Sequence, residues 1–390
     1  MNYILFDGAA RKQLLPFTYT KPVADLRFGI LTLREKWEKF LETTTTTVTE
    51  DYLAERWPMV EMEQNTMINA AVCPSESLVE QIKNLKEHQV LTFKDTYIAF
   101  RTKEDEEVDL DQCETIEVVK EPLILVHSWD LFAKNDLAIQ ADFILLTKDR
   151  TSVEIPEGVF CVNKEQIFIE EGAKLTMASL NASSGPIYIG KDAEVMEGCT
   201  VRGPFALCDH ATLKMGAKIY GATTVGPHCK VGGEVNNSVL MGYSNKGHDG
   251  FLGNSVLGEW CNLGADTNNS NLKNNYAEVR LWDYETERFA PTGLQFCGLM
   301  MGDHSKCGIN TMFNTGTVVG VSANIFGAGF PRNFIPSFSW GGSNGTTTYK
   351  TNKAFEVAEK VMQRRSIDFT EEDKAILEHV FEETKKFRRE

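Results

Sequence analysis

The sequence predicts an α/β domain followed by a parallel β-helix of six-residue repeats and a short helical segment. The repeat is the strongest observation, because eight consecutive sixth positions from Ile189 to Val231 are all branched aliphatic residues. A strand alternates with a period of two and a helix with a period of 3.6, so neither produces a sustained period of six. A triangular coil, in which each of three short strands turns one large side chain inward, does produce it.

The same period returns after a long interruption. The second run consists of Met301, Cys307, Phe313, Val319 and Ile325. Between the two runs, residues 266–296 are rich in asparagine and fit no repeat. A loop of that length inside a regular solenoid commonly serves a binding site or a subunit contact. We therefore expect a β-helix over residues 151–330, with a functional excursion inside it.

Residues 1–150 show a different, mixed pattern. Strands are expected at Tyr3–Phe6, 43–49, 97–101 and 115–119, and helices at 30–41 and 77–85. Ser75 or Ser77 is a suitable N-cap for the second helix. This mixture of short strands and amphipathic helices predicts an α/β domain.

Residues 331–390 begin with prolines and glycines and then become helical. Two helices are expected, at 353–365 and 371–387, and Thr370 with the acidic residues after it is a typical helix N-terminus. A β-helix ends in a coil whose strand edges are exposed. We expect the two helices to cap that open end.

The composition excludes several classes of protein. The formal net charge is −15, and nucleic-acid binding requires a basic surface, so nucleic acid is not an expected partner. No apolar run of about eighteen residues occurs, and the first residues show no signal-peptide pattern, so neither a membrane span nor secretion is expected. Nine cysteines without CxxC spacing indicate reduced thiols. These features predict a cytoplasmic protein.

A histidine lies where the period breaks. The register indicates a two-residue insertion near Tyr243, and the glycine-rich segment after it contains His248. An imidazole titrates near neutral pH and suits a general base when a rigid framework holds it. The alternative is an ordinary histidine in a surface loop.

Two segments around this histidine resemble a known family. His248-Asp249-Gly250-Phe251-Leu252-Gly253 and Asn262-Leu263-Gly264-Ala265-Asp266-Thr267 are similar to the acetyltransferase half of the bifunctional N-acetylglucosamine-1-phosphate uridylyltransferase / glucosamine-1-phosphate acetyltransferase family. The stretch 302–310 resembles the archaeal-type members, and the similarity covers about 230–330. It implies a left-handed β-helix, a homotrimer, acetyl-CoA as co-substrate and an amino-sugar phosphate as acetyl acceptor.

The resemblance also implies roles for single residues. His248 falls on the family's catalytic base, which takes a proton from the attacking amine. Ala265 falls on a position that lines acetyl-CoA. Asn262 and Asn271 fall on positions beside the acceptor sugar.

The chain departs from this family at three positions that bind substrate. A phosphate-binding lysine, a tyrosine and a glycine of the family are replaced here by Asn236, Phe251 and Asp266. Loss of the lysine removes a charge-assisted contact, so the acceptor can differ from glucosamine 1-phosphate. Candidates for compensating charge are Lys214, Lys218 and Lys246.

The beginning of the chain resembles a second family, the sugar nucleotidyltransferases. The similar segments are Gly8-Ala9-Ala10-Arg11, Leu14-Leu15-Pro16-Phe17-Thr18 and Lys21-Pro22. The resemblance implies that Gly8, Arg11 and Lys21 contact the phosphates of a nucleoside triphosphate or sugar nucleotide.

This second motif is incomplete. Its second glycine is missing, and its metal-binding aspartate falls at 69–71, where the sequence reads Asn-Ala-Ala. Asp7 and Asp142 are the remaining candidates for Mg²⁺, which is required only if this domain transfers nucleotides. We expect the nucleotidyltransferase fold and leave its activity open.

Three hypotheses follow. The leading one is a sugar-phosphate acetyltransferase with a nucleotidyltransferase-like N-terminal domain. The second is a zinc-dependent β-helix enzyme, because His210 and His228 are one coil apart and the insertion would bring His248 into the same column. The third is a non-catalytic trimeric scaffold that binds sugar nucleotides.

Overall fold

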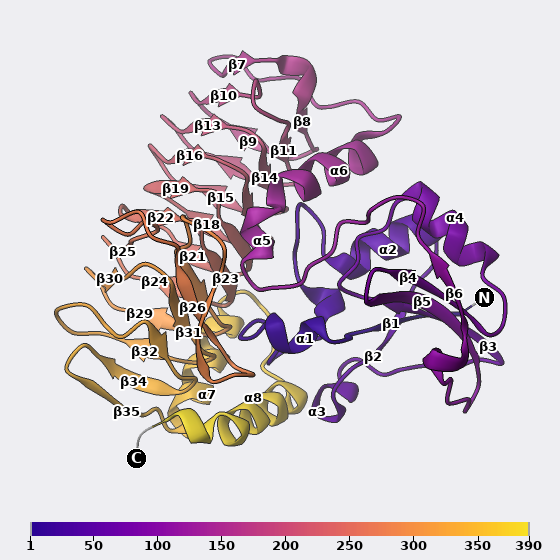
Figure 1. Cartoon of the computed structure of the whole chain (residues 1–390). Coiled ribbons are helices and arrows are strands. Elements are labelled where there is room, and N and C mark those ends of the chain that lie inside the picture. The colour runs from indigo at the N-terminus through magenta and orange to yellow at the C-terminus, as the bar shows by residue number, and fades with distance from the viewer. Residues whose placement is uncertain (1, 389–390) are drawn as a thin grey trace. The chain divides into compact units, whose positions relative to one another are not determined.

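The computed structural model describes residues 2–388 and divides them into two compact units (Figure 1). The first unit contains the residues up to 14, 20–26 and 31–127. The second contains 15–19, 27–30 and the chain from 128 onward. Two short pieces of the N-terminal sequence therefore belong to the same unit as the repeats.

The first unit is built on one six-stranded mixed sheet. In spatial order its strands are β2 (Thr46–Val48), β1 (Asn2–Phe6), β3 (Gln64–Asn69), β5 (Thr96–Lys103), β4 (Gln89–Phe93) and β6 (Glu114–Glu117). β1 is parallel to both of its neighbours, whereas β5 is antiparallel to β3 and β4. The predicted α/β domain is confirmed, although the sequence pattern did not reveal β3 or β4.

Four α-helices accompany this sheet: α1 (Ala10–Gln13), α2 (Leu33–Leu41), α3 (Asp51–Ala54) and α4 (Glu76–Asn84). α2 begins at a complete capping box, in which the side chains of Thr32 and Glu35 accept from each other's backbone N–H groups. At the start of α4 the Ser75 hydroxyl accepts from the Leu78 N–H, so Ser75 is the N-cap. Local sequence therefore determines where both longer helices begin.

The second unit is dominated by a three-sided parallel β-helix (Figure 1). Face 1 consists of β7 (Phe160–Val162), β10 (Ser179–Asn181), β13 (Thr200–Arg202), β16 (Lys218–Tyr220), β19 (Glu234–Asn236) and β22 (Phe251–Gly253). Face 2 consists of β8 (Ile167–Ile169), β11 (Ile187–Ile189), β14 (Phe205–Leu207), β17 (Thr223–Val225), β20 (Val239–Gly242), β23 (Val256–Glu259), β28 (Leu299–Met301), β31 (Thr317–Val319) and β33 (Phe334–Ile335). Face 3 consists of β9 (Lys174–Leu175), β12 (Glu194–Val195), β15 (Thr212–Leu213), β18 (Lys230–Val231), β21 (Asn245–Lys246), β24 (Asn262–Leu263), β29 (Lys306–Cys307), β32 (Asn324–Ile325) and β34 (Ser339–Gly342).

The predicted inward positions form the core of this β-helix. All residues of the two six-residue runs, from Ile189 to Val231 and from Met301 to Ile325, are buried in one apolar cluster. Leu213 pairs with Val231, its counterpart one coil of eighteen residues later. Burial of these side chains in successive layers stabilises the solenoid, and the predicted fold class is confirmed.

The interruption near Tyr243 is a shortening of the coil, and the predicted two-residue insertion is wrong. After Val231 the inward residues are Val235, Leu240 and Lys246, so two faces use fewer than six residues. Val231 therefore pairs with Lys246 only fifteen residues later. A pattern of period six cannot distinguish a few missing residues from a few extra ones. The pairing between coils makes that distinction.

The long excursion forms its own small structure. After β25 (Asn268–Asn269), which pairs with β30 (Met312–Phe313), the chain makes an antiparallel hairpin of β26 (Arg280–Asp283) and β27 (Arg288–Pro291). Trp282 of this hairpin stacks on Phe334 with ring centroids 4.1 Å apart. Phe387 packs edge-on against the same two rings. The excursion is therefore packed against a late coil and the C-terminal segment.

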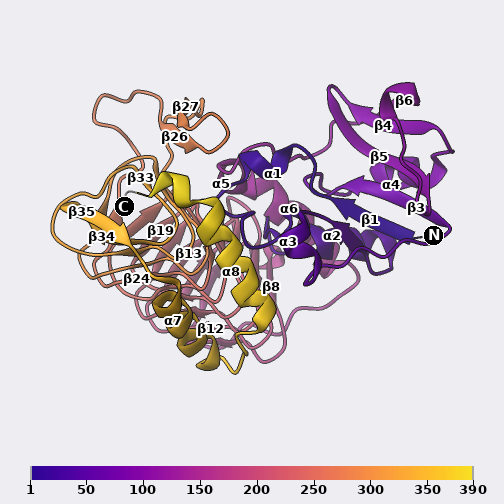
Figure 2. The same ribbon diagram turned by 90° about the horizontal axis from the view of Figure 1, so that it is seen from below.

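The C-terminal helices, α7 (Thr351–Gln363) and α8 (Glu371–Glu383), lie along the side of the β-helix (Figure 2). Arg365 donates to the His228 carbonyl at 3.1 Å, whereas Phe381 packs edge-on against Phe338 in the last coil. The helices thus extend over several coils, which differs from the expected cap on the open end. That end is instead closed on face 3 by β35 (Gly345–Thr348), which pairs with β34. The predicted N-cap Thr370 is confirmed by a complete capping box.

Face 2 is covered from outside by two further helices, α5 (Asp130–Ala133) and α6 (Asn135–Thr147), together with residues 27–30. Asn135 donates to the Ala222 carbonyl and to the Thr224 hydroxyl, both at 3.0 Å. No helix within residues 2–388 combines the length and apolarity needed to cross a membrane.

Candidate functional site

His248 lies at the corner where the chain passes from β21 on face 3 to β22 on face 1. Both His248 and Asp249 are exposed. The Asp266 N–H donates to the Asp249 carbonyl at 3.1 Å, so the Ala265–Asp266 turn of the next coil lies beside the His248–Asp249 turn. The structure therefore brings together the residues that the sequence assigned to the base and to the acetyl-CoA side.

The shape of this corner requires glycine at one position. Gly250 has φ of 112°, a conformation that L side chains rarely adopt. A Cβ atom there would lie 2.1 Å from the Thr267 carbonyl oxygen of the next coil. Gly247, on the other side of His248, has open space where a Cβ atom would be, with no neighbouring atom within 4 Å. The turn is thus tightly packed at Gly250, after the histidine, whereas a side chain at Gly247, before it, would meet open space.

Lys246 points into the solenoid, and not outward toward a substrate as predicted. Its side chain occupies the inward row of face 3 and is 2% exposed. The ammonium group donates to the His248 carbonyl at 2.5 Å. Burial lowers the pKa of Lys246 to about 8, against the opposing effect of the Asp249 and Asp266 carboxylates. Lys246 therefore binds the peptide group of His248 from the interior of the β-helix.

Phe251 and Asn271 meet on face 1, one strand beyond the corner. A Cβ atom on Gly253 would lie 2.5 Å from the Phe251 ring and 2.8 Å from Asn271 Nδ2, so the ring and the amide converge over this glycine. Asn271 also donates to Asn254 Oδ1 at 2.8 Å. These two predicted substrate residues are thus neighbours: Phe251 follows His248 directly along the coil, and Asn271 belongs to the next coil.

Lys218 lies on the same face, two strands away. It is in register with Glu234, which is in register with Phe251, so neighbouring strands about 4.8 Å apart place Lys218 roughly 10 Å from Phe251. Lys218 lines a shallow hollow of about 320 Å³ together with Arg202 and Tyr220. Two basic side chains therefore border an open surface beside the candidate site.

Asn262 lies on the other side of the corner. It is exposed on face 3, where its register partners are Asn245 and Lys306. Face 3 and face 1 meet at the His248 corner, so the predicted acceptor residues are divided between the two faces. Within this chain the predicted residues therefore lie on both sides of the His248 corner, and they do not form a closed pocket.

The other corner of the same coils carries a column of stacked rings, of which the sequence predicted the His210–His228 pair. His210 stacks on His228 at 4.8 Å, His228 on Tyr243 at 4.9 Å and Tyr243 on Trp260 at 4.2 Å. His304 continues the column 6.3 Å from Trp260. All five residues have φ between 54° and 61° and precede a strand of face 3. The eighteen-residue spacing of the first two histidines was the available signal.

This column contradicts the geometry assumed for a zinc site. Because the coil is shortened, the residue stacked after His228 is Tyr243, and His248 lies at a different corner. Within the described residues no three His, Cys, Asp or Glu side chains are placed to hold a metal ion. Burial lowers the pKa of His228, and the positive charges of His210 and Arg365 act in the same direction. His210 and His228 are therefore packing residues of this corner.

In the first unit, the glycine turn after β1 is present but its charged residues bind each other. Gly8 has φ of 61° and leads into α1. Arg11 is 8% exposed and donates to Asp7 at 2.8 Å and to the Tyr52 hydroxyl at 2.9 Å. Lys21 is 4% exposed. Arg11 and Lys21 are therefore buried in this unit, and neither is displayed for a nucleotide phosphate as predicted.

Neither candidate for Mg²⁺ has the surroundings of a metal ligand. Asp7 accepts from Arg11, from the Val23 N–H at 2.7 Å and from the Thr49 hydroxyl at 2.5 Å. Burial raises the pKa of Asp7, although Arg11 opposes this effect. Asp142 belongs to the second unit, is 2% exposed and accepts from the Ile30 N–H at 2.7 Å. Protein donors already use both carboxylates, so these residues do not fit the ion.

Asn69 occupies the end of β3, directly beside Phe6 at the end of β1. Its amide donates to the Tyr97 carbonyl and accepts from the Ala71 N–H, both at 3.0 Å. This is the place where the family motif would put its metal-binding aspartate. One N–H and the oxygen of this amide therefore hold the loop.

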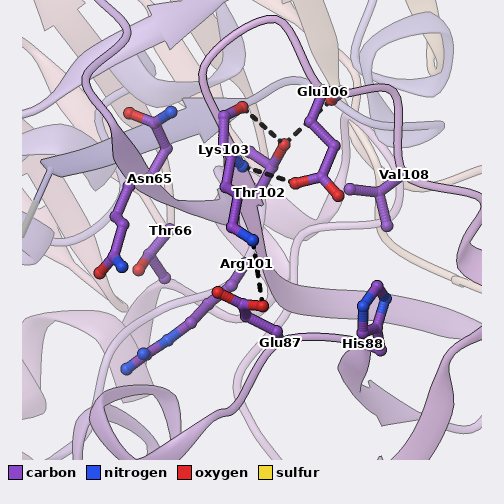
Figure 3. A pocket seen from close by; sticks show the side chains of 10 residues that line it. Asn65, Thr66, Glu87, His88, Arg101, Thr102, Lys103, Glu106 and Val108 are labelled. Atoms are coloured by element: carbon purple, nitrogen blue, oxygen red, sulfur yellow. Dashed lines mark hydrogen bonds and ion pairs between the residues drawn. The ribbon is translucent and has the colours of Figure 1, made fainter.

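The first unit also contains a cavity of about 40 Å³, lined by the paired strands β3 and β5 and by the segments 87–88 and 106–108 (Figure 3). Thr66 and Arg101 are cross-strand partners that line it, and within residues 2–388 neither Thr66 Oγ1 nor Arg101 Nε has a hydrogen-bond partner. In Figure 3 the Lys103 ammonium binds Glu87 at 3.2 Å beside the cavity. Polar walls and this volume suit ordered water, which would satisfy both atoms.

Comparison with known proteins gives one family assignment, for the N-terminal part of the chain. Residues 3–151 match the model of the family described as sugar nucleotidyl transferase. No curated protein matches the chain. The N-terminal part is therefore similar to a transferase family.

Several solved structures of acyltransferases are distantly similar. The polySia-specific acetyltransferase NeuO is 12% identical, with 53% of this chain and 94% of that chain covered and a TM-score of 0.27. An Arabidopsis UDP-N-acetylglucosamine acyltransferase is 14% identical, with coverages of 60% and 99% and a TM-score of 0.23. The N-acyltransferase AntD from Bacillus cereus, in complex with dTDP and coenzyme A, is 11% identical, with coverages of 55% and 100% and a TM-score of 0.23. TM-scores this low are no evidence for function, and the β-helix of this chain rests on its own strand pairing.

Proposed function

We propose that the protein is a transferase whose β-helix moves an acetyl group from acetyl-CoA to the amine of an amino-sugar phosphate, with His248 as general base. The observation that carries this proposal is the position of His248. It is an exposed imidazole on a rigid corner, next to the Ala265 turn and directly before β22, the strand that begins at Phe251 and meets Asn271. A base must be presented to the substrate by a framework that does not move, and the stacked coils supply that framework.

In this proposal the acceptor amine attacks the thioester carbonyl carbon while an imidazole nitrogen of His248 takes the amine proton. The new C–N bond forms, the C–S bond breaks, and the proton passes to the departing thiolate of CoA. Lys218, and Arg202 one strand further away, would attract the anionic group of the acceptor as it approaches along face 1, and salt should weaken this attraction. An amino-sugar phosphate or a sugar nucleotide fits this charge pattern.

For the first unit we propose binding of a sugar phosphate or nucleoside triphosphate without efficient nucleotidyl transfer. Asp7 is engaged by Arg11, and Asn69 stands where the motif requires an acid. These two observations also favour the second candidate function for the whole chain, a trimeric scaffold that binds sugar nucleotides. Binding of acetyl-CoA and of UTP by calorimetry without any product would support the scaffold.

The decisive experiment compares His248→Ala with His210→Ala. Loss of a general base typically lowers turnover by about 10²–10⁴-fold, so H248A should lose acetyl transfer to a panel of amino-sugar phosphates by that factor. His210 is also a partly exposed histidine of the solenoid, but it belongs to the ring column, and H210A should keep its activity within about twofold. An H248A protein as active as the parent would contradict the role of His248.

The assembly is tested at the same time. A homotrimer would place neighbouring β-helices beside the open flanks of the His248 corner, and sedimentation of the parent protein measures its mass directly. H248A should sediment like the parent, because an exposed side chain contributes little to stability.

A further inference from the structure

One charged residue interrupts the apolar inward row of face 3. The row consists of Leu175, Val195, Leu213, Val231, Lys246, Leu263, Cys307 and Ile325. Every other member belongs to the buried apolar cluster of the β-helix. Lys246 therefore occupies a position that the repeat otherwise reserves for an apolar side chain.

A buried ammonium group destabilises a fold unless specific partners compensate for lost hydration. Replacement of such a group by an apolar side chain of similar volume is often neutral or stabilising. The row shows that leucine fits, since Leu213 and Leu263 occupy equivalent positions. Stability alone therefore does not explain a lysine here.

The hydrogen-bond acceptor of Lys246 indicates why a charged side chain is buried here. Its ammonium donates to the His248 carbonyl, and in the part of the chain that the structure describes it is the one donor to that oxygen. The charged groups that face it are the Asp249 carboxylate of the same turn, the Asp266 carboxylate of the next coil and the Cys307 thiol of the coil beyond. The side chain is thus a strut between the core and the peptide group of the candidate base.

We propose that Lys246 is a positioning residue, which anchors the His248 peptide from inside the coil and thereby fixes the direction of the imidazole. The inference rests on the proposed role of His248 and deepens it. The opposite side of the turn explains the need for such an anchor. A Cβ atom on Gly247, directly before the histidine, would meet open space, and the Asp249 carbonyl after the histidine accepts from the Asp266 N–H of the next coil. The strut adds a restraint on the His248 peptide itself, from inside the coil.

The contact can be observed without any enzymatic assay. His248-Asp249 is the single His-Asp pair in the sequence, so a protein labelled with ¹³C-carbonyl histidine and ¹⁵N-aspartate gives one carbonyl–amide correlation in an NMR spectrum. Because burial lowers the pKa of Lys246 to about 8, the carbonyl shift of His248 should show a step near that pH as the donor loses its charge. In Lys246→Met this step should vanish.

A matched control comes from a second lysine of face 3, which is half-buried. Lys306 also donates to a carbonyl two residues away, that of His304, and burial lowers its pKa to about 8 as well. It belongs to the corner with the ring column, so Lys306→Met should leave the step of the His248 carbonyl unchanged. A spectrum without the step in the parent, or a step that persists in K246M, overturns the proposal.

The catalytic consequence is measured separately. If His248 is the base, K246M should lower kcat for acetyl transfer by about 10²-fold with little change in the KM for acetyl-CoA, as misplacement of a catalytic group by about 1 Å does. Lys246→Leu should behave alike and covers the case in which methionine packs badly. Acetyl transfer with parental kcat in a folded K246M overturns the positioning role, whereas an inactive parent with an intact NMR step refutes the proposed function and leaves the strut.

Discussion

The two corners that bound face 3 use histidine in opposite ways. At the corner with face 2, His210 and His228 are stacked in a column with Tyr243 and Trp260, and their rings touch ring neighbours above or below at 4.2–4.9 Å. At the corner with face 1, the His248 side chain is exposed, and its peptide carbonyl accepts from Lys246. A ring fixed by stacking contributes to the fold, whereas a ring fixed through its backbone stays available for chemistry. Stacking, and not residue type, separates structural histidines from a candidate base in this solenoid.

The most direct test of this comparison is to remove the most buried ring of the column. Trp260 is 7% exposed and lies between Tyr243 and His304. Trp260→Ala should lower the free energy of unfolding by about 3–5 kcal/mol, the usual cost of a large aromatic cavity. Denaturant unfolding measures it, with H248A as the control that should change stability by less than about 0.5 kcal/mol. Equal effects of the two changes would contradict the division between the corners.

The strut beneath the other corner should make stability depend on pH. Lys246 has a pKa of about 8 in the folded chain, and an unfolded lysine titrates near 10.4. Between these values the unfolded chain binds more protons, so the free energy of unfolding should rise with pH, by up to about 3 kcal/mol. The difference between parent and K246M, measured by denaturant unfolding under reducing conditions from about pH 7 to 10.5, isolates this effect from that of Lys306. A difference that stays constant over this range would show that Lys246 is not buried in its charged form.

The turn around His248 offers a smaller and more local test. Gly250→Ala introduces a Cβ atom 2.1 Å from a carbonyl oxygen at φ of 112°, and should destabilise the protein by about 1–3 kcal/mol. Gly247→Ala, three positions earlier, meets open space and should change stability by less than about 0.5 kcal/mol. Thermal unfolding of the two variants checks the asymmetry. If G247A is the more damaging change, the turn is not held by close packing at Gly250.

The sequence predicted the regular parts of this protein well and the irregular parts less well. The rows from Ile189 to Val231 and from Met301 to Ile325 were readable because each inward residue repeats a local steric requirement. Thr370 was readable as a cap, and Ser75 as one of two candidates with Ser77, because a cap acts within one helical turn. The position of α7 and α8 along the coils was not readable, because it depends on contacts such as Phe381 with Phe338.

The candidate site shows the same limit. His248 and Ala265 were foreseen, and the structure places their turns side by side. The outward role given to Lys246 was wrong, because a coil shortened by three residues moves it from the surface to the interior. The pairing of Asp7 with Arg11 was also hidden, since it depends on the way the turn after β1 folds back.

By itself the sequence determined that the chain forms a β-helix after an α/β domain and that a histidine lies where the period breaks. Those features follow from local rules, since an inward side chain every six residues is required whatever lies around the coil. Only the tertiary structure decided which histidines stack, which lysine points inward and which carboxylates are already engaged. The physical reason is that neighbours in a solenoid are about one coil apart in sequence, so a change of a few residues in one face alters every contact between coils without leaving a clear mark on the local pattern.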